Sequence, residues 1–443
     1  MKSILVLGAG RSSAALIDYL LQQAEHNDWR VTVADVSVEA ARERVGNSPK
    51  GSAISFDILQ ESASLIIREY DVVISMLPQL LHPIIAKKCL QYGKHLLNAS
   101  YVSDEIKLFD AQAREKGLLF LNECGLDPGI DHMSAMQVID RIKNQGGELH
   151  SFESFTGGLI APETDPENPW RYKFTWNPRN VITAGQGTAK FLQNGQYKYI
   201  PHQQLFKRIT SIEVPGYGAY EGYPNRDSLK YRNTYGLQKI KTMLRGTLRD
   251  KGFCGAWDIF VQLGCTDDTY KMEEVGHMTH DDFINSFLEY HPDWTVEEKI
   301  AHKFHMRLEG PELQRLNWSG LFDNEPVGLK EGSPAQILEH ILNKRWKLNS
   351  HDRDMIVMWH RFRFKQEGRE REMHASLVVQ GENAIHTAMA KTVGLPLGIA
   401  AKLLLQEKIK GRGVLIPTSK EFYEPILNEL KTLGIELSES EAG

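Results

Sequence analysis

A glycine-rich turn and an acidic residue near the start of the chain have the spacing of a dinucleotide-binding site. Gly8 and Gly10 follow an apolar run at residues 3–7, and Asp35 directly follows a second apolar run at residues 30–34. Gly8 permits a tight turn, and Gly10 lets backbone amides approach a pyrophosphate at the N-terminus of the next helix. The Asp35 carboxylate can accept hydrogen bonds from both hydroxyls of an adenosine ribose, whereas a 2′-phosphate there would meet like charge. The pattern therefore favours NAD over NADP.

Two features depart from this fingerprint. Ser13 stands where the pattern has its third glycine, and its side chain would crowd the helix slightly against the strand. Arg11, Arg42 and Arg44 lie in the loop and on the following helix, where a guanidinium could swing toward a 2′-phosphate. Solvated charge on a helix surface is the more ordinary interpretation of these arginines. NADP therefore stays possible as the cofactor.

The segments after Asp35 alternate between apolar runs and helical patterns. This alternation predicts a doubly wound parallel sheet of six strands, which is a Rossmann-type α/β domain. The four further strands are expected at residues 53–56, 72–76, 95–98 and 118–122. Such a sheet binds its ligands at the carboxyl ends of the strands. The side chains expected at that edge are Ser75, Leu77, Ser100 and Tyr101.

Beyond about Gly146 the sequence becomes rich in glycine, proline and aromatic residues, and β-type segments appear. We expect a dinucleotide-binding domain with a C-terminal segment packing back on it, a second α/β domain with a mixed sheet, and a small helical subdomain. A hairpin around Gly368 belongs to the second domain. The dinucleotide-binding domain is expected at residues 1–130, with the C-terminal segment at about 384–443. The second α/β domain is expected at residues 131–265 and 346–383, and the helical subdomain at residues 266–345.

The composition is that of an ordinary globular protein. The 443 residues carry a formal charge of −5, which gives no electrostatic reason to expect nucleic-acid or membrane-surface binding. No apolar run approaches the roughly 20 residues of a membrane span, and no signal peptide precedes the first strand, so a cytoplasmic location is expected. The four cysteines lack Cys-x-x-Cys spacing and the histidines lack ligand spacing, so no metal site is predicted.

A second constellation follows the sixth strand, where residues 122–132 read Asn-Glu-Cys-Gly-Leu-Asp-Pro-Gly-Ile-Asp-His. At this segment the chain resembles the saccharopine dehydrogenases that form glutamate, also called saccharopine reductases. The resemblance covers nearly the whole chain in order; the helical insert and residues 163–168 are less similar. Further matching blocks lie at residues 172–179, 225–228, 244–249, 352–355, 392–396 and 409–411.

The resemblance implies a Rossmann domain, an α/β domain that carries saccharopine and a homodimer contact, and a small helical subdomain. It places saccharopine contacts on Ser100, Tyr101, Asp127, Arg226, Arg245, Gly246 and Thr247. It places cofactor contacts on Arg11, Ser12, Asp35, Asp57, Ile58, Ser75, Ala99 and Leu126, with Trp176 near the nicotinamide. The glycine loop adds Gly8, Gly10 and Ser13, and Ser100 also borders the cofactor.

The chemistry implied by the resemblance suits these residue types. Saccharopine is glutamate joined through its nitrogen to the side chain of lysine, so three carboxylates flank one secondary amine. The guanidinium forks of Arg226 and Arg245 can each take a carboxylate bidentately. Asp127 can hold the ammonium group, and Asp127, Tyr101 and His132 are the local candidates for proton transfer. Hydride transfer to the nicotinamide, followed by hydrolysis of the imine, would yield glutamate and 2-aminoadipate 6-semialdehyde.

Plainer interpretations of these residues stay open. Either arginine could form a structural ion pair, as could Arg171, Arg179 and Arg249, and Asp127 could cap its own turn. One alternative function is the condensation of an amino-aldehyde with a diamine, as in carboxynorspermidine formation. The other is a nucleotide-sensing protein without catalysis.

Overall fold

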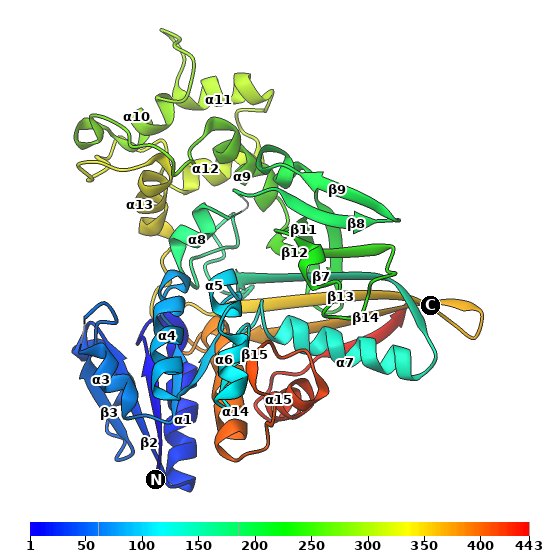
Figure 1. Ribbon diagram of the computed structural model, residues 1–443. Coiled ribbons are helices and arrows are strands. Elements are labelled where there is room, and N and C mark those ends of the chain that lie inside the picture. The colour runs from blue at the N-terminus through cyan, green and yellow to red at the C-terminus, as the bar shows by residue number, and fades with distance from the viewer. Residues whose placement is uncertain (61, 185, 443) are drawn as a thin grey trace. The chain divides into compact units, whose positions relative to one another are not determined.

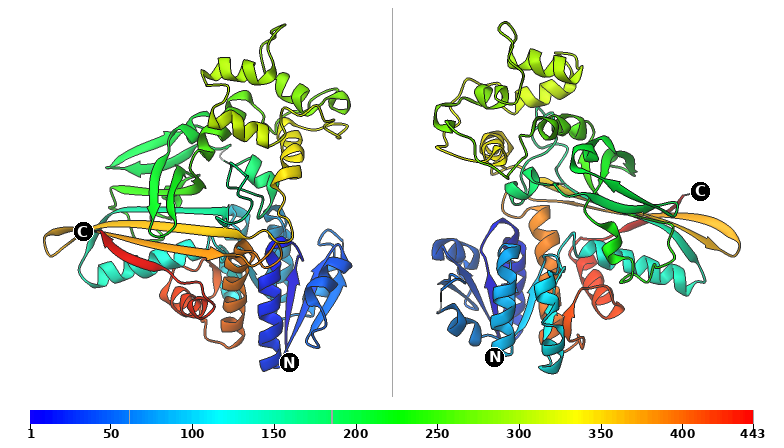
Figure 2. Two further views of the ribbon diagram at one scale, coloured as in Figure 1. Left: turned by 180° about the vertical axis from the view of Figure 1, so that it is seen from behind. Right: turned by 45° about the horizontal axis from the view of Figure 1, so that its top comes forward.

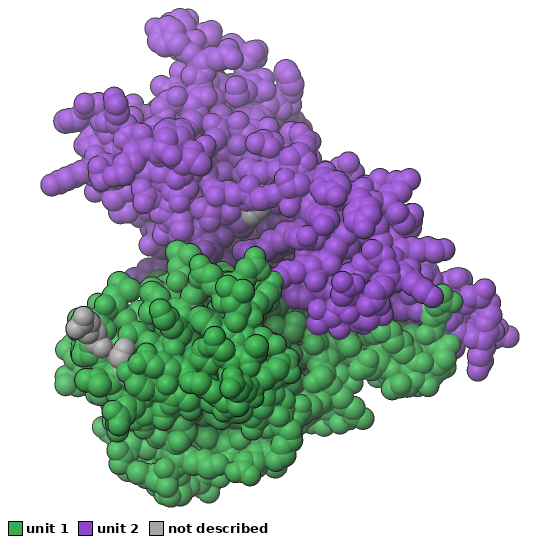
Figure 3. Space-filling model, in the orientation of Figure 1, with its two compact units in different colours: residues 1–148, 377–438 green, residues 149–376, 439–443 purple. Residues whose placement is uncertain are grey.

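The computed structural model describes residues 1–60, 62–184 and 186–442, which form two compact units. The first unit comprises Met1–Glu148 with Leu377–Ser438, and the second comprises Leu149–Ser376 with Glu439–Gly443 (Figure 3). The first unit therefore includes the helix that follows residue 130, which lies beyond the expected boundary of the dinucleotide-binding domain. The division into three domains stays a prediction.

The first unit is built on a parallel sheet with the strand order β15-β6-β5-β4-β1-β2-β3 (Figure 1). Its strands are β1 (Lys2–Leu7), β2 (Trp29–Asp35), β3 (Gly51–Ser55), β4 (Val72–Ser75), β5 (His95–Asn98), β6 (Leu119–Leu121) and β15 (Gly413–Leu415). The order reverses beside β1, as in doubly wound folds, so the predicted fold class is confirmed. The described part has seven strands in this sheet rather than the six expected, because the three residues of β15 pair with β6 and are too few to show a periodicity.

Helices pack against this sheet. The helices of the first unit are α1 (Ala14–His26), α2 (Val38–Val45), α3 (Ala63–Arg68), α4 (His82–Tyr92), α5 (Asp104–Lys107), α6 (Asp110–Glu115), α7 (Ile130–Asn144), α14 (Ala388–Leu405) and α15 (Lys420–Thr432), and α7 packs against α15. Leu5, Val73 and Leu96 on one sheet face share a core with residues of α3 to α6. Short 3-10 helices stand at Arg11–Ser13 and Gln79–Leu81.

Helix α14 packs directly on α1 (Figures 1 and 2). A Cβ atom at Gly394 would lie 2.9 Å from the Cβ of Leu16, and one at Gly398 would lie 2.6 Å from the ring of Tyr19. These glycines therefore permit the close approach of the two helices. By length and composition α14 could cross a membrane, but 83% of that window is buried inside the structure. It packs here as a core helix.

The second unit holds a mixed sheet of nine strands. Its main path is β10-β11-β12-β7-β13-β14-β16, and β8 pairs with β12 and β9. The strands are β7 (Glu148–Ile160), β8 (Ala189–Gln193), β9 (Gln196–Ile200), β10 (Thr210–Val214), β11 (Gly218–Pro224), β12 (Thr242–Asp250), β13 (Asp354–Gln366), β14 (Arg369–Gln380) and β16 (Ser438–Ala442). Between β13 and β14, Glu367 and Gly368 both have positive φ, as a two-residue hairpin turn requires.

The helices of the second unit are α8 (Pro178–Ile182), α9 (Phe253–Leu263), α10 (His280–Asn285), α11 (Val296–Phe304), α12 (Pro311–Trp318) and α13 (Pro334–Trp346). Short 3-10 helices occupy His202–Lys207, Ser228–Tyr231 and Val275–His277. The helices α10, α11 and α13 each begin with a capping box, so their N-termini are encoded locally. An aromatic cluster around Trp170, Trp257 and Trp346 joins α9 and α13.

Candidate active site

The glycine loop between β1 and α1 has the geometry of a pyrophosphate cradle. Gly8 has φ of +104°, and a Cβ atom there would lie 3.3 Å from the carbonyl carbon of Met76. Gly10 faces open space, where a side chain would stand between the backbone amides and a ligand. Ser13 is buried, and its hydroxyl donates to the carbonyl oxygen of Gly10 at 2.8 Å. The serine in place of the third glycine therefore closes the loop, and the residues fit a bound dinucleotide.

Asp35 is joined to this loop by hydrogen bonds. Its Oδ2 accepts from the backbone N–H of Ala9 at 2.8 Å, and its Oδ1 accepts from that of Ser37 at 3.0 Å. Each carboxylate oxygen keeps a further lone pair that could accept from a ribose hydroxyl. The Nε of Arg44 lies 3.5 Å from the carbonyl oxygen of Ala9, whereas Arg42 is exposed on α2. Acidic and basic groups therefore both border the place expected for the ribose.

The other residues expected at the cofactor lie at the same edge of the sheet. Asp57 caps its own turn after β3 by accepting from the N–H of Leu59 at 2.9 Å, and Ile58 beside it is buried. Ser75 ends β4, and its hydroxyl accepts from the N–H of Leu77 at 3.4 Å. The fold therefore brings Asp35, the Asp57 turn and Ser75 to the carboxyl ends of β2, β3 and β4, at one edge of the sheet. Arg11 and Ser12 follow the glycines, and Ala99 and Leu126 follow β5 and β6.

The ends of β5 and β6 are tied together by buried amides. Asn98 donates from Nδ2 to Oδ1 of Asn122 at 2.8 Å, and its Oδ1 accepts from the N–H of Ser100 at 3.0 Å. A Cβ atom at Gly125 would lie 2.8 Å from that of Ala99, so the two loops pack closely. These contacts hold Ser100 and the 122–132 segment in fixed positions.

A buried pair of titratable groups supports the same loops. Glu123 accepts at Oε1 from the N–H of Val102 and at Oε2 from Nε2 of His132, both at 2.9 Å. The side chains of Glu123 and His132 are 1% and 0% exposed. The structure therefore shows His132, one of the proton-transfer candidates, enclosed in the protein beside Glu123. Nothing in the local sequence pattern marks Glu123, because its partners lie on a separate loop and on α7.

Tyr101 and Asp127, the two residues expected to take part in catalysis, lie beside each other. The Tyr101 hydroxyl donates to Oδ1 of Asp127 at 3.3 Å, and both side chains are half-buried. The turn that presents Asp127 has room only for glycine at position 129, where a Cβ atom would lie 2.0 Å from the carbonyl oxygen of Gly125. The turn and the tyrosine loop together form a polar pair at the edge of the sheet.

The second unit brings together the residues expected to bind the substrate carboxylates. Arg245 and Thr247 stand two positions apart on β12, so their side chains face the same side of the sheet. Arg245 is 7% exposed, and its guanidinium lies 4.7 Å from the ring centre of Tyr231. A Cβ atom at Gly246 would lie 2.4 Å from both the ring of Phe155 and the carbonyl oxygen of Tyr223, so no larger residue fits there.

The loop that carries Arg226 is joined to β12 by hydrogen bonds. Asn225 donates from its backbone N–H to the carbonyl oxygen of Arg245 at 2.9 Å, and from Nδ2 to Oγ1 of Thr247 at 3.2 Å. Arg226 itself is exposed and has φ of +51°. The loop therefore presents Arg226 close to Arg245 and Thr247, although about 20 positions separate it from them in the sequence.

A third arginine on the same face of β12 is enclosed by rings. Arg249 is 5% exposed, and its guanidinium lies 4.9 Å from the ring centre of Tyr172 and 5.3 Å from that of Phe253. Among the described residues its Nε has no hydrogen-bond partner. Burial raises the pKa of Tyr172, while the guanidinium of Arg249 and the side chain of Trp176 lower it in part. Trp176 therefore lies beside Tyr172 and close to this arginine.

Other charged residues in the matching blocks are held in ion pairs. Arg179 pairs with Glu339 at 2.7 Å and with Asp268 at 2.9 Å, which is a structural role. Lys173 is buried between Asp165 and Asp352, each at 2.8 Å. A further group whose geometry could suit a metal, His280, Asp323 and Glu325, is engaged by other contacts. Asp323 pairs with Arg345, Glu325 with Lys344, and Nδ1 of His280 with the carbonyl oxygen of Gly320.

Comparisons with known proteins identify the family. Family models described as the saccharopine dehydrogenase NADP binding domain and the saccharopine dehydrogenase C-terminal domain match residues 4–121 and 125–435. The chain belongs to the saccharopine dehydrogenase family. This confirms the resemblance drawn from the motifs.

Known proteins match nearly the whole chain. A relative from Schizosaccharomyces pombe, named saccharopine dehydrogenase [NADP(+), L-glutamate-forming], is 33% identical over 99% of both chains. The mitochondrial alpha-aminoadipic semialdehyde synthase of Bos taurus is 34% identical over 98% of this chain and 47% of its own length. The structure of the apo saccharopine dehydrogenase (L-Glu forming) of Saccharomyces cerevisiae superposes with a TM-score of 0.90 at 30% identity, covering all of both chains.

Proposed function

We propose that this chain oxidises saccharopine to glutamate and 2-aminoadipate 6-semialdehyde with a nicotinamide dinucleotide as hydride acceptor. The observation that carries the proposal is the 33% identity to a glutamate-forming saccharopine dehydrogenase over 99% of both chains. The cradle at Gly8 and Gly10, and the arginines Arg226 and Arg245, supply the chemical groups that such a reaction needs.

The proposed roles follow from the charges of the substrate. Arg226 and Arg245 bind carboxylates of saccharopine through their guanidinium forks. Asp127 faces the amine and holds its positive charge, and the Tyr101 hydroxyl, which donates to Asp127, orients that carboxylate. Arg249 adds positive charge on the same face of β12 and strengthens the attraction for a multiply charged anion. The glycine loop and Asp35 bind the dinucleotide, which, when bound, accepts the hydride.

In the reaction, hydride leaves the lysine-derived carbon beside the secondary amine, and the amine nitrogen loses a proton. Water adds to the resulting imine, and cleavage of the carbon–nitrogen bond releases glutamate and the semialdehyde. Asp127 and Tyr101 are the groups at the edge of the first sheet that we propose to accept and return protons. Alignment of the donor carbon with the nicotinamide provides much of the remaining acceleration.

The choice between the two nicotinamide dinucleotides is a separate proposal. The family model for residues 4–121 and the names of the fungal relatives point to NADP. The Asp35 carboxylate, which is bonded to the glycine loop and would face a 2′-phosphate, supports NAD instead. We propose NAD as the preferred cofactor of this chain, with NADP as a weaker alternative.

The experiment that tests the function is product analysis with the purified chain. Saccharopine and NAD should yield one glutamate and one semialdehyde for each dinucleotide reduced. Formation of lysine in place of glutamate, or no reduction of either dinucleotide, would contradict the proposal. Incubation of the semialdehyde with a diamine and NADH tests the alternative condensation, which should give no turnover above background. Cofactor binding without turnover would instead favour the nucleotide-sensing alternative.

Two properties of the assembled enzyme stay predictions. A homodimer is expected from the resemblance, and light scattering on the purified chain would test it. A cytoplasmic location is expected from the sequence, although the mammalian relatives are named as mitochondrial; fractionation of the source cells would test it.

A further inference from the structure

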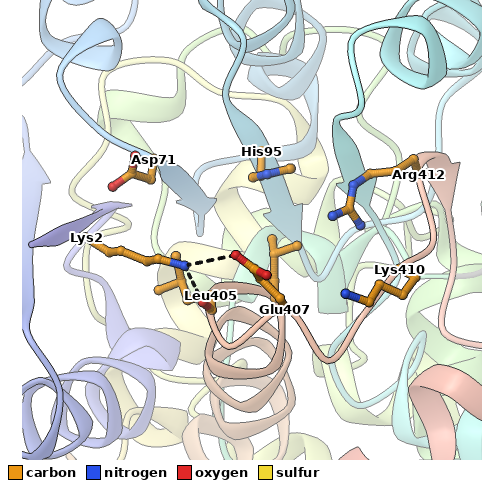
Figure 4. A pocket seen from close by; sticks show the side chains of 8 residues that line it. Lys2, Asp71, His95, Leu405, Glu407, Lys410 and Arg412 are labelled. Atoms are coloured by element: carbon orange, nitrogen blue, oxygen red, sulfur yellow. Dashed lines mark hydrogen bonds and ion pairs between the residues drawn. The ribbon is translucent and has the colours of Figure 1, made fainter.

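A pocket of about 290 Å³ opens in the first unit at the edge of the sheet opposite the proposed cofactor site (Figure 4). Lys2, Asp71 and His95 stand at or beside the amino ends of β1, β4 and β5. All strands of this sheet are parallel, so these ends lie away from Ser75 and Ala99. The residues lining the pocket are Lys2, Asp71, His95, Leu404, Leu405, Glu407, Lys410 and Arg412. None of the proposed substrate or cofactor contacts falls on them.

His95 contributes a neutral hydrogen-bond donor to this pocket. Its Nδ1 accepts from the backbone N–H of Leu119 at 2.9 Å, which leaves the proton on Nε2. Burial, together with the positive charges of Arg412 and Lys2, lowers the pKa of His95 to about 4, against the opposing effect of the Asp71 carboxylate. At neutral pH the ring therefore presents an N–H group without a charge, and the influence of Arg412 and Lys2 places both cations close to it.

Three cations converge on the space in front of this ring. Figure 4 shows the Lys410 ammonium and the Arg412 guanidinium pointing toward the same region, which the Lys2 ammonium borders while it donates to the carbonyl oxygen of Leu405 and lies near Glu407. Two backbone hydrogen bonds orient the guanidinium of Arg412, because its Nη1 donates to the carbonyl oxygens of Ile409 at 3.0 Å and Gly411 at 2.8 Å. Within the described ranges, no ion pair is found for the Lys410 ammonium. The pocket therefore gathers donors that are not fully used by the protein.

The two acids of the pocket only partly balance these charges. Asp71 is turned toward β1, where its Oδ2 accepts from the N–H and the hydroxyl of Ser3 at 2.7 and 3.0 Å. Glu407 lies 4.0 Å from Lys2, and its side chain is 77% exposed. An exposed carboxylate at that distance can move aside at little cost, since exposed ion pairs contribute little to stability. The lining thus favours an additional anion.

We propose that this pocket binds a small doubly charged oxyanion, either an inorganic phosphate or a short dicarboxylate. Arg412 and Lys410 bind its oxygens, the Nε2–H of His95 donates a further hydrogen bond, and Glu407 turns outward to admit it. A guanidinium and a neutral imidazole N–H give directional hydrogen bonds, and the lysines add charge without fixed geometry. This binding site is separate from the reaction proposed above and does not depend on it.

Isothermal titration calorimetry on the full chain, at pH 7.5 and constant ionic strength, tests the proposal with phosphate and with glutarate as separate ligands. At least one should bind with saturation, and the comparison shows which source of oxyanion the pocket takes. Lys410→Ala should weaken that binding at least fivefold. Lys408→Ala, which removes the same charge from an exposed residue outside the lining, should leave it unchanged.

Glu407→Gln provides a test in the opposite direction. It removes the competing carboxylate, so the affinity for the oxyanion should rise at least threefold. Binding that is unaffected by both Lys410→Ala and Glu407→Gln would belong to another site, such as the arginines of β12, and would overturn the proposal. Equal losses in Lys410→Ala and Lys408→Ala would overturn it as well, because they would indicate general surface charge. Lys410 is exposed, so its variant should fold normally, which thermal melting would verify.

Discussion

The hydroxyl of Tyr101 donates a hydrogen bond to Oδ1 of Asp127 at 3.3 Å, although 26 positions separate the two residues. Glu123 contributes to this arrangement because it accepts from the N–H of Val102, beside Tyr101, and from His132 on α7. The hydrogen bonds of Glu123 thus hold the loop that carries Tyr101 close to the turn that carries Asp127. This support explains how two loop residues can keep a defined position.

Asp127→Asn should reduce kcat by about 10²- to 10⁴-fold if the carboxylate moves a proton in the reaction. Tyr101→Phe should give a smaller loss, because it removes one hydrogen bond and leaves the charge in place. The double variant should lose less than the product of the two single effects, since the residues are in contact. Steady-state kinetics with saccharopine measures all three. Asp104→Asn, an exposed acid on α5, serves as the control. Unchanged turnover in Asp127→Asn would remove this residue from catalysis.

Arg245→Lys should raise the KM for saccharopine about 10- to 100-fold, since a charge-assisted bond contributes roughly 1.5–3 kcal/mol and a lysine has no fork. Arg226→Lys should act in the same direction. A KM increase larger than the loss in kcat would indicate binding rather than chemistry. Arg208→Lys, an exposed arginine of the same unit, should leave both constants unchanged. If Arg245→Lys behaves like Arg208→Lys, Arg245 does not bind the substrate.

The preference for NAD should depend on the charge of Asp35. The wild-type chain should have the higher kcat/KM with NAD, and Asp35→Asn should lower the ratio of the NAD value to the NADP value at least tenfold by removing repulsion of a 2′-phosphate. Asparagine keeps one acceptor oxygen in place of two, so the loss of a bond from the Ala9 or the Ser37 N–H will affect both dinucleotides alike, and the ratio is the relevant quantity. Glu43→Gln on the exposed side of α2 is the control. A large preference of the wild type for NADP would show that the Asp35 argument is wrong.

Gly246→Ala should destabilise the protein by about 1–3 kcal/mol or more, because its methyl group would overlap the ring of Phe155 and the carbonyl oxygen of Tyr223. Gly187→Ala, where nothing lies within 4 Å of the new atom, should be close to neutral. Thermal or urea unfolding compares the two variants. Equal stability of both would mean that β12 and its neighbours are packed less tightly than the structure shows.

Stability should fall as the pH is lowered from about 6.5 toward 4. Burial lowers the pKa values of His82 and His95 to about 4, so the unfolded chain takes up protons in this range while the folded chain does not. Each such histidine lowers the free energy of unfolding by at most about 1.4 kcal/mol for each pH unit in this range. Urea unfolding at several pH values should show a weaker pH dependence in His82→Gln than in wild type. His26→Gln, on an exposed residue, should keep the original dependence.

Much of the first unit follows from local patterns. The apolar runs, the glycines at 8 and 10 and the acidic residue after β2 identify a parallel sheet with a dinucleotide cradle, because turn geometry and strand periodicity depend on near neighbours in the chain. The hairpin at Gly368 follows in the same way. The motif blocks, taken together, identified the family, which full-length similarity confirms.

Long-range packing decided the remaining features. Three contacts join segments that are distant in the sequence, and no local pattern predicts them. They are the pairing of β15 with β6, the burial of His132 against Glu123, and the hydrogen bonds of Asn225 to β12. The pocket between the amino ends of three strands and the end of α14 has the same origin. Such contacts depend on how whole elements fill space and satisfy buried polar groups, which is a property of the folded chain as a whole. The sequence by itself therefore determined the kind of fold and the family, and the tertiary structure alone decided which side chains meet.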